Sequence, residues 1–332
     1  MVNPFSGDGF TMASLMRSID KLPYVPGRIA ALGLFSNEGV NVPTVLIEER
    51  DQQLVLVANT RRGAPSQTQP GEQRKMRSFV TTHLPLEDYV TTDDLLGMRE
   101  FGSETAQESL SAKVNKKLAK MKQSLSATLE WMRLGCLKGI VLDGSGNTVY
   151  NYFNEFGIPT PTAFDFTLGT TTTDIRGKCS DVNEAISVAL NGRPMDHVHA
   201  FCGSTFFKRL MGHADVKDML KWANPTMNTV DPLARGSFTY GDIIWEPYRG
   251  QINGTPYVPQ NGCIFFPVGS PDVFTTFYGP STWLETAGQN GVPIYAKQIP
   301  TDENTGTRVL VQSNPLPLCL LPAVLRTGTT SN

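Results

Sequence analysis

The longest regular pattern of apolar positions predicts a single helix over residues 103–138. Between Gly102 and Gly139 there is no proline and only one glycine, Gly135. Apolar residues recur there at spacings of three or four, which places them in one stripe along a helix. The stripe consists of Leu110, Val114, Leu118, Met121, Leu125, Leu129, Met132 and Cys136. A rod of this length measures about 54 Å and has one apolar seam, so we expect it to lie along a long sheet or a partner chain.

Two β-rich segments flank a long polar stretch and predict an extended hairpin. Residues 44–58 and residues 78–86 carry the β-rich pattern, whereas residues 61–77 hold only two apolar side chains. A two-stranded ribbon is marginally stable alone in water, so this one is expected to rest on something, such as another chain. Five basic residues and one acidic residue give the stretch a net charge of +4. A solvated loop would explain this equally well; otherwise the candidates for contact with another subunit are Arg61, Arg62, Arg74, Lys75 and Arg77.

Shorter patterns fill the rest of the chain. The first forty residues mix short apolar pieces with prolines and glycines and predict an arm, with one or two helical turns around residues 12–19. The other expected elements are a hairpin at 139–153, helices at 174–190, 204–211 and 216–222, strands at 195–201, 238–245 and 262–267, a strand pair at 293–299 and 308–312, and a buried apolar tail at 316–325. Strands and helices do not alternate regularly, which favours an α+β fold over a doubly wound sheet.

Composition narrows the class of protein. The 332 residues allow about two domains, and 29 Lys and Arg against 31 Asp and Glu give a formal net charge of −2. This balance disfavours nucleic-acid binding through a strongly basic surface. Charged residues make up 18% of the chain, below the roughly 25% of ordinary soluble proteins, which predicts much surface in contact with something other than water. No apolar run approaches the ~20 residues of a spanning helix, and the N-terminus lacks a signal-peptide pattern.

The sequence offers no strong catalytic constellation. The five cysteines form no CxxC pair, so we expect reduced, mostly buried side chains. The best metal candidate is His197 and His199 with Cys202 and His213, which would make the protein a metal-dependent hydrolase. The better interpretation of the histidines is that they are strand and turn residues beside a core. A nucleophile would be Cys202 or Ser204, activated by His199 or His213. Cys202 is better explained as a buried strand end, and Gly203–Ser204 as the N-cap of a helix. We therefore predict no enzyme activity, no metal and no cofactor.

Residues 240–318 carry the most specific pattern. It consists of the segments Tyr240–Arg249 (YGDIIWEPYR), Gly262–Gly269 (GCIFFPVG), Phe274–Pro280 (FTTFYGP), Pro293–Lys297 (PIYAK) and Gln312–Leu318 (QSNPLPL). This series resembles the lambda-type major capsid proteins of tailed bacteriophages, the capsid protein E family. The order of arm, hairpin, long helix and mixed domain is also similar, so the resemblance covers nearly the whole chain.

The resemblance implies the Hong Kong 97-type capsid fold. In that fold an arm reaches over a neighbour, an E-loop hairpin lies across the adjacent subunit, a peripheral (P) domain holds a spine helix and a long sheet, and an axial (A) domain surrounds the symmetry axes. The expected divisions are the arm at 1–43, the E-loop at 44–88, the P domain at 89–156 and 285–315 with the spine helix at about 103–138, and the A domain at 157–284 and 316–332. We expect neither a Lys–Asn cross-link between subunits nor a large scaffold-like prodomain.

The resemblance also implies a function. It is a structural subunit that assembles through hexamers and pentamers into an icosahedral head around double-stranded DNA. The expected partners are other copies of the chain, packaged DNA bound without sequence preference, portal and scaffold proteins and in some systems decoration proteins, with no membrane. The subunit would assemble in the bacterial host cytoplasm and reside in the virion. The alternative within the same fold is a non-viral shell that encloses a protein cargo.

Overall fold

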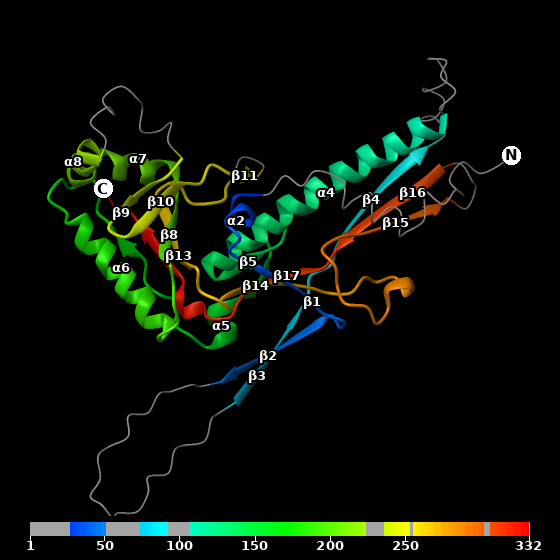
Figure 1. The fold of residues 1–332 in the computed structure, drawn as a ribbon, viewed down its shortest axis with the longest axis horizontal. Helices are drawn as coiled ribbons and strands as arrows, with labels where there is room; N and C mark the ends of the chain where they lie inside the picture. Colours follow the sequence, from blue (N-terminus) through cyan, green and yellow to red (C-terminus); the bar gives the residue numbers. More distant parts are fainter. Residues whose placement is uncertain are drawn as a thin grey trace, which may run out of the picture.

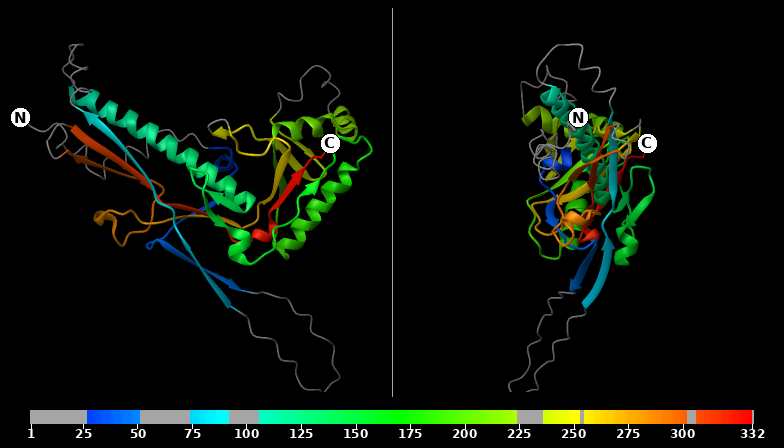
Figure 2. Two further views of the ribbon diagram at one scale, coloured as in Figure 1. Left: turned by 180° about the vertical axis from the view of Figure 1, so that it is seen from behind. Right: turned by 90° about the vertical axis from the view of Figure 1, so that its right-hand side faces the viewer.

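The computed structural model describes residues 27–50, 74–91, 106–223, 236–252, 255–301 and 306–331. It has an elongated part, in which one long helix lies on a narrow sheet, and a thicker part, in which helices flank a wider sheet (Figure 1). A two-stranded hairpin leaves the middle of the molecule and projects away from both parts (Figures 1 and 2). Helices and strands are mixed without regular alternation, which confirms the predicted α+β class.

The elongated part is built on α4 (Ala106–Lys138), which confirms the predicted long helix and is about 50 Å long. It lies on an antiparallel sheet in the order β15-β16-β4. The strands of this sheet are β15 (Tyr295–Pro300), β16 (Gly306–Ser313) and β4 (Leu84–Thr91). The pairing of β15 with β16 confirms the strand pair expected at 293–299 and 308–312. This long sheet therefore covers the part of the apolar stripe of α4 from Val114 to Leu125, which confirms that the stripe lies along a long sheet.

The stripe of α4 enters two separate cores. Val114, Leu118, Met121 and Leu125 pack in a small cluster with residues of the long sheet. Met132 and Cys136, two turns further on, belong instead to the large core of the thicker part. Gly139 ends the helix with a φ of +82°, a conformation that residues with a Cβ rarely adopt. One helix thus ties the elongated part to the thicker part.

A second three-stranded sheet lies at the junction of the two parts and has the order β1-β14-β17. Its strands are β1 (Ser36–Gly39), β14 (Phe274–Tyr278) and β17 (Pro315–Cys319). The short helix α2 (Arg28–Ala31) precedes β1 and rests on α4, where Glu130 Oε1 accepts a hydrogen bond from Ile29 N at 2.7 Å. The second part of the expected arm, residues 27–43, is therefore attached to the body of its own chain, while residues 1–26 lie outside the described residues.

The thicker part is a six-stranded mixed sheet flanked by helices. Its strand order is β7 (Phe164–Asp165), β18 (Arg326–Thr329), β13 (Gly262–Val268), β8 (His197–Cys202), β10 (Ile243–Pro247) and β9 (Phe238–Tyr240). The helices are α6 (Ile175–Leu190), α7 (Ser204–Gly212) and α8 (Ala214–Ala223). Fully buried aromatic rings of Phe166, Phe206, Trp245 and Phe265 pack edge to face or stacked at its centre.

Smaller elements complete the chain. They are β5 (Ile140–Leu142), β6 (Thr148–Asn151), α5 (Tyr152–Phe156), β11 (Gln251–Ile252), β12 (Thr255–Pro256) and the 3₁₀ turns η5 (Leu284–Thr286) and η6 (Pro322–Val324). The pair β5–β6 confirms the hairpin predicted at 139–153. The C-terminal tail is buried as expected, with Leu316, Leu318 and Leu325 no more than 2% exposed. All five cysteines are buried and free, which confirms the interpretation of their spacing.

Two predicted strands are interrupted in the structure. The strand expected at 238–245 is a hairpin, because Gly241 and Asp242 both have φ near +60° and join β9 to β10. Two consecutive positive φ values are typical of a type I′ turn. The strand expected at 78–86 stops at Val80 and resumes at Leu84, because the chain leaves the hairpin there and joins the long sheet beside β16.

Candidate functional site

The hairpin that projects from the body is formed by β2 (Thr44–Arg50) and β3 (Arg74–Val80). Side chains alternate between its two faces, as in any strand pair. On the inner face Val45 lies opposite Phe79, and both are buried. The ring of Phe79 packs against the rings of Tyr150, Tyr152 and Phe156, at centroid distances of 5.4, 6.3 and 5.9 Å. This aromatic cluster anchors the base of the hairpin to its own subunit.

Polar bonds reinforce the anchor. The Tyr150 hydroxyl accepts a hydrogen bond from Val80 N at 2.8 Å and donates one to Val80 O at 3.0 Å. Arg77 donates to the carbonyl oxygens of Glu155 and Phe156, the latter at 3.1 Å, and its guanidinium lies 5.1 Å from the Phe156 ring centroid. Rings and hydrogen bonds together fix the direction in which the hairpin leaves the body.

The structure describes the surroundings of only one of the five predicted contact residues. Arg77 is engaged with its own chain at the base of the hairpin. Arg74 and Lys75 lie on β3, further out along the hairpin, and no side-chain position is described for them. Arg61 and Arg62 lie outside the described residues. A role of these five residues in contact with a neighbour therefore stays a prediction.

The outer face of the hairpin carries an apolar stripe that the charge pattern did not indicate. Leu46 is 61% exposed, Met76 is 71% exposed and Val80 is 52% exposed. Strand register places all three on the face opposite Val45 and Phe79, since Thr44 pairs with Val80, Leu46 with Ser78 and Glu48 with Met76. We call Leu46, Met76 and Val80 the outer stripe. The signal in the sequence was the run Val45, Leu46 and Ile47, because consecutive apolar residues of a strand lie on both of its faces.

The lysine-rich face of α4 is partly engaged within the subunit. Lys117 Nζ lies 3.2 Å from Asp88 Oδ1 and also donates to the carbonyl oxygen of Tyr89, both on β4. Lys116 and Lys120 are exposed on the helix. Exposed ion pairs of this kind contribute little stability, so Lys117 chiefly fixes the position of β4 against α4.

The predicted metal candidates do not form a metal site. His199 Nε2 lies 3.0 Å from Glu246 Oε2, and Arg28 donates two hydrogen bonds to the same carboxylate. His213 is held elsewhere, with its Nε2 3.2 Å from the carbonyl oxygen of Thr170. Within the described part of the chain, no three His, Cys, Asp or Glu side chains are grouped so as to hold a metal ion. The histidines instead serve packing and hydrogen bonding.

Neither nucleophile candidate is activated in the structure. Cys202 is fully buried at the end of β8, and burial raises the pKa of its thiol well above the usual value. A buried thiol stays protonated and reacts poorly. Ser204 is exposed and is the first residue of α7, so the helix start predicted at Gly203–Ser204 is confirmed, with Gly203 in the N-cap position. A side chain at position 203 would meet the carbonyl oxygen of Pro259, which explains why glycine stands there.

Membrane insertion through a helix finds no support in the described residues. None of their helices combines the length and the apolar character that a bilayer crossing requires, and α4 fails because its exposed faces are charged.

Comparison with known proteins gives a consistent result. The family model described as phage major capsid protein E matches residues 11–330. The major capsid protein of Pseudomonas phage KPP10 is 27% identical over 346 residues, which cover 98% of each chain. The major capsid protein of Salmonella phage Felix O1 is 23% identical over 95% of each chain.

Solved structures agree on the fold. The putative capsid protein of a prophage of E. coli CFT073 superposes with a TM-score of 0.58 at 12% identity, covering 97% of this chain and 99% of that one. The mature capsid of bacteriophage PhiM1 gives a TM-score of 0.53 at 10% identity, covering 94% and 89%. The fold is therefore that of Hong Kong 97-type capsid subunits, as predicted. Because the family model spans nearly the whole chain, the protein belongs to the phage major capsid protein E family.

Proposed function

We propose that this protein is the major capsid protein of a tailed bacteriophage. It assembles through hexamers and pentamers into an icosahedral head that encloses double-stranded DNA. The match of the family model to residues 11–330 is the observation that carries this proposal. The role is structural: subunits are held by contacts with one another and no reaction is required of any side chain.

The outer stripe supplies a reason for assembly. A projecting two-stranded ribbon with Leu46, Met76 and Val80 open to water is unfavourable in an isolated subunit. The cluster around Phe79 buries the opposite face in the subunit itself, so the outer stripe remains available to a second copy. A patch on one subunit that meets a different patch on the next makes a heterologous contact, which closes into a ring when the rotation permits.

The structural elements correspond to the parts of the capsid fold. The hairpin is the E-loop; α4 with the long sheet is the core of the P domain; and the six-stranded sheet with α6, α7 and α8 is the core of the A domain. The basic residues beyond the hairpin base meet acidic groups of the adjacent subunit and set register more than they add stability. Assembly takes place in the host cytoplasm with portal and scaffold proteins, and the packaged DNA is bound without sequence preference.

The test is to charge the outer stripe. We expect the double variant Leu46→Asp and Met76→Asp to fold but to give few or no shells in electron micrographs, since each interface loses contacts worth on the order of 2 kcal/mol. Val188→Asp is the matched control, because Val188 is equally exposed, at 73%, but lies on α6. The control should form normal particles. Circular dichroism checks that both proteins are folded.

Three outcomes would contradict the proposal, each in a different way. Normal shells from the double variant would remove the outer stripe from the assembly contact. Deletion of residues 61–73, which leaves β3 intact, would then test the rest of the hairpin. Particles from the natural source that contain protein cargo and no nuclease-protected DNA would favour a non-viral shell. A wild-type protein that stays a single copy at every concentration would exclude both.

A further inference from the structure

A buried arginine faces a cavity without a charged partner. Arg133 of α4 is 5% exposed. Its guanidinium donates to Thr276 Oγ1 at 3.0 and 3.1 Å and to Asn37 Oδ1 at 3.0 Å, and it lies 5.2 Å from the centroid of the Phe35 ring. All of these partners are neutral. Among the described residues, none accepts a hydrogen bond from its Nη1 and no carboxylate lies within ion-pair distance.

The neighbouring carboxylate is used elsewhere. Glu130 lies one turn before Arg133 on α4 and is buried, but its Oε1 accepts from Ile29 N and from the Tyr248 hydroxyl, at 2.7 and 3.0 Å. A buried charge without a counter-charge is costly. Arg133 is therefore held by neutral partners alone in the described part of the chain, at the wall of a cavity from which an anion could reach it.

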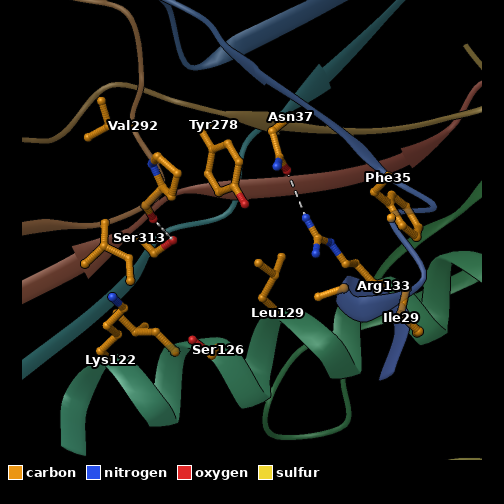
Figure 3. Close-up of a pocket in the computed structure, with 15 residues that line it drawn as sticks. Ile29, Phe35, Asn37, Lys122, Ser126, Leu129, Arg133, Tyr278, Val292 and Ser313 are labelled. Atoms are coloured by element: carbon orange, nitrogen blue, oxygen red, sulfur yellow. Dashed lines mark hydrogen bonds between the residues drawn. The ribbon is translucent and has the colours of Figure 1, made fainter. Parts of the chain in front are cut away.

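The cavity in front of Arg133 has a volume of about 550 Å³. Figure 3 shows the guanidinium reaching from α4 towards Asn37, with Leu129 and Ser126 along the same helix and Lys122 at the far end. The lining residues of α4 are Lys122, Leu125, Ser126, Leu129 and Arg133. They form one helical face about 16 Å long. Ile29, Phe35, Val292 and Ile294 add apolar walls. The site thus suits a short apolar segment that ends in a carboxylate.

The chain itself contains such a segment. Met12, Leu15, Met16 and Ile19 fall at positions i, i+3, i+4 and i+7, and Asp20 follows directly. This spacing is typical of one apolar helical face. Two helical turns measure about 11 Å, which is within the length of the cavity. No acidic residue interrupts the apolar positions before Asp20.

We propose that residues 12–20 dock in this cavity of their own chain, with Asp20 as the counter-charge of Arg133. The segment precedes Gly27, and the cavity is lined by Ile29, Ala30 and Gly33, only a few residues further on. Six residues lie between Asp20 and Gly27, and the seven Cα-to-Cα steps span up to about 23 Å. A tether this short gives an effective concentration in the millimolar range, which favours the same chain over a second copy. Residues 1–11 remain to reach a neighbour.

The test is a disulfide between the segment and the cavity in the full-length chain. Met16→Cys is combined with Ser126→Cys, which lies on the cavity wall, and the control combines Met16→Cys with Ser145→Cys in the exposed β5–β6 turn. The five native thiols are buried. On mild oxidation we expect an intrachain disulfide in the first pair, formed at least about tenfold faster than in the control because docking holds the two sulfurs near each other. Adding Asp20→Asn to the first pair should slow the formation of this disulfide.

Non-reducing gels separate the outcomes. A disulfide that links two chains would overturn the assignment to the same chain and place the segment in a second copy's cavity. Equal rates for the two pairs, in proteins whose circular dichroism matches wild type, would overturn docking altogether. If the two groups pair, Arg133→Met should slow disulfide formation as much as Asp20→Asn does, and the double variant should be no slower than either single variant. Independent effects of the two substitutions on this rate would overturn the ion pair. None of these readouts requires shell formation, so they do not depend on the assembly function.

Discussion

At the scale of single residues, Lys138 shows how burial changes a charged group. It is the last residue of α4, donates to the carbonyl oxygen of Tyr257 and lies with its ammonium 5.8 Å from the Trp131 ring centroid. Burial lowers the pKa of Lys138 from 10.5 to about 8, because the charged form loses its hydration. Below pH 8 the amine is charged in both the folded and the unfolded chain. The folded state then bears the full free-energy cost of burying a charged amine.

This pKa predicts a pH-dependent effect of Lys138→Met. Between pH 8 and 10.5 the unfolded chain binds more protons at this position than the folded chain, so the wild type gains stability as the pH rises. The free energy of unfolding of the variant minus that of the wild type should therefore fall by about 3 kcal/mol from pH 7 to pH 10.5. Urea unfolding of both proteins across this range measures the difference, and groups common to both cancel. A difference that does not change with pH would contradict the lowered pKa.

At the scale of elements, α4 joins two cores that have no fully buried residue in common. Its first half packs on the long sheet through Leu118 and its neighbours, while its second half enters the core beneath the six-stranded sheet. A sheet of three strands cannot bury both of its faces by itself, and α4 covers one of them. The stability of the elongated part should therefore depend strongly on the stripe.

Leu118→Ala tests this dependence. Leu118 is fully buried between α4 and the long sheet, so its truncation should lower the free energy of unfolding by about 2–5 kcal/mol. Gln123→Ala is the control, since Gln123 is exposed on the same helix and alanine has a high helix propensity. Urea unfolding monitored by circular dichroism gives both values. Equal stability of the two variants would mean that the long sheet does not rely on this seam.

Elements with a local signal were predictable, and elements defined by distant partners were not. The spacing of the apolar residues in α4 and the flanking glycine gave its bounds to within a few residues. By contrast, β4 pairs with β16, more than 200 residues away, and nothing near residues 81–83 announces the change of partner. The parallel pairing of β1 with β14 has the same cause. The consecutive apolar residues of β2 indicated that both faces of the hairpin carry apolar side chains, but only strand register could show which face is the buried one.

At the scale of the whole molecule, the hairpin makes the subunit directional. Its inner face is occupied by its own body, through Phe79, and its outer stripe faces away. In the proposed assembly each copy donates one hairpin and receives one at a different surface, as heterologous contacts require. A directional contact and a self-complementary contact therefore predict different results when variant and wild-type subunits are mixed.

Mixed assembly separates the two kinds of contact. A subunit with Leu46→Asp and Met76→Asp cannot donate its hairpin but can still receive that of a wild-type neighbour. When it is a small minority in a mixture with wild type, we expect it to enter shells, since each variant copy disables only one of the two contacts it makes. When it is the majority, adjacent defects accumulate and shells should be lost. Mass spectrometry of subunits from gradient-purified particles measures the incorporated fraction. Exclusion of the variant at every ratio would mean that the hairpin face is also the receiving surface, and the contact would then be self-complementary rather than directional.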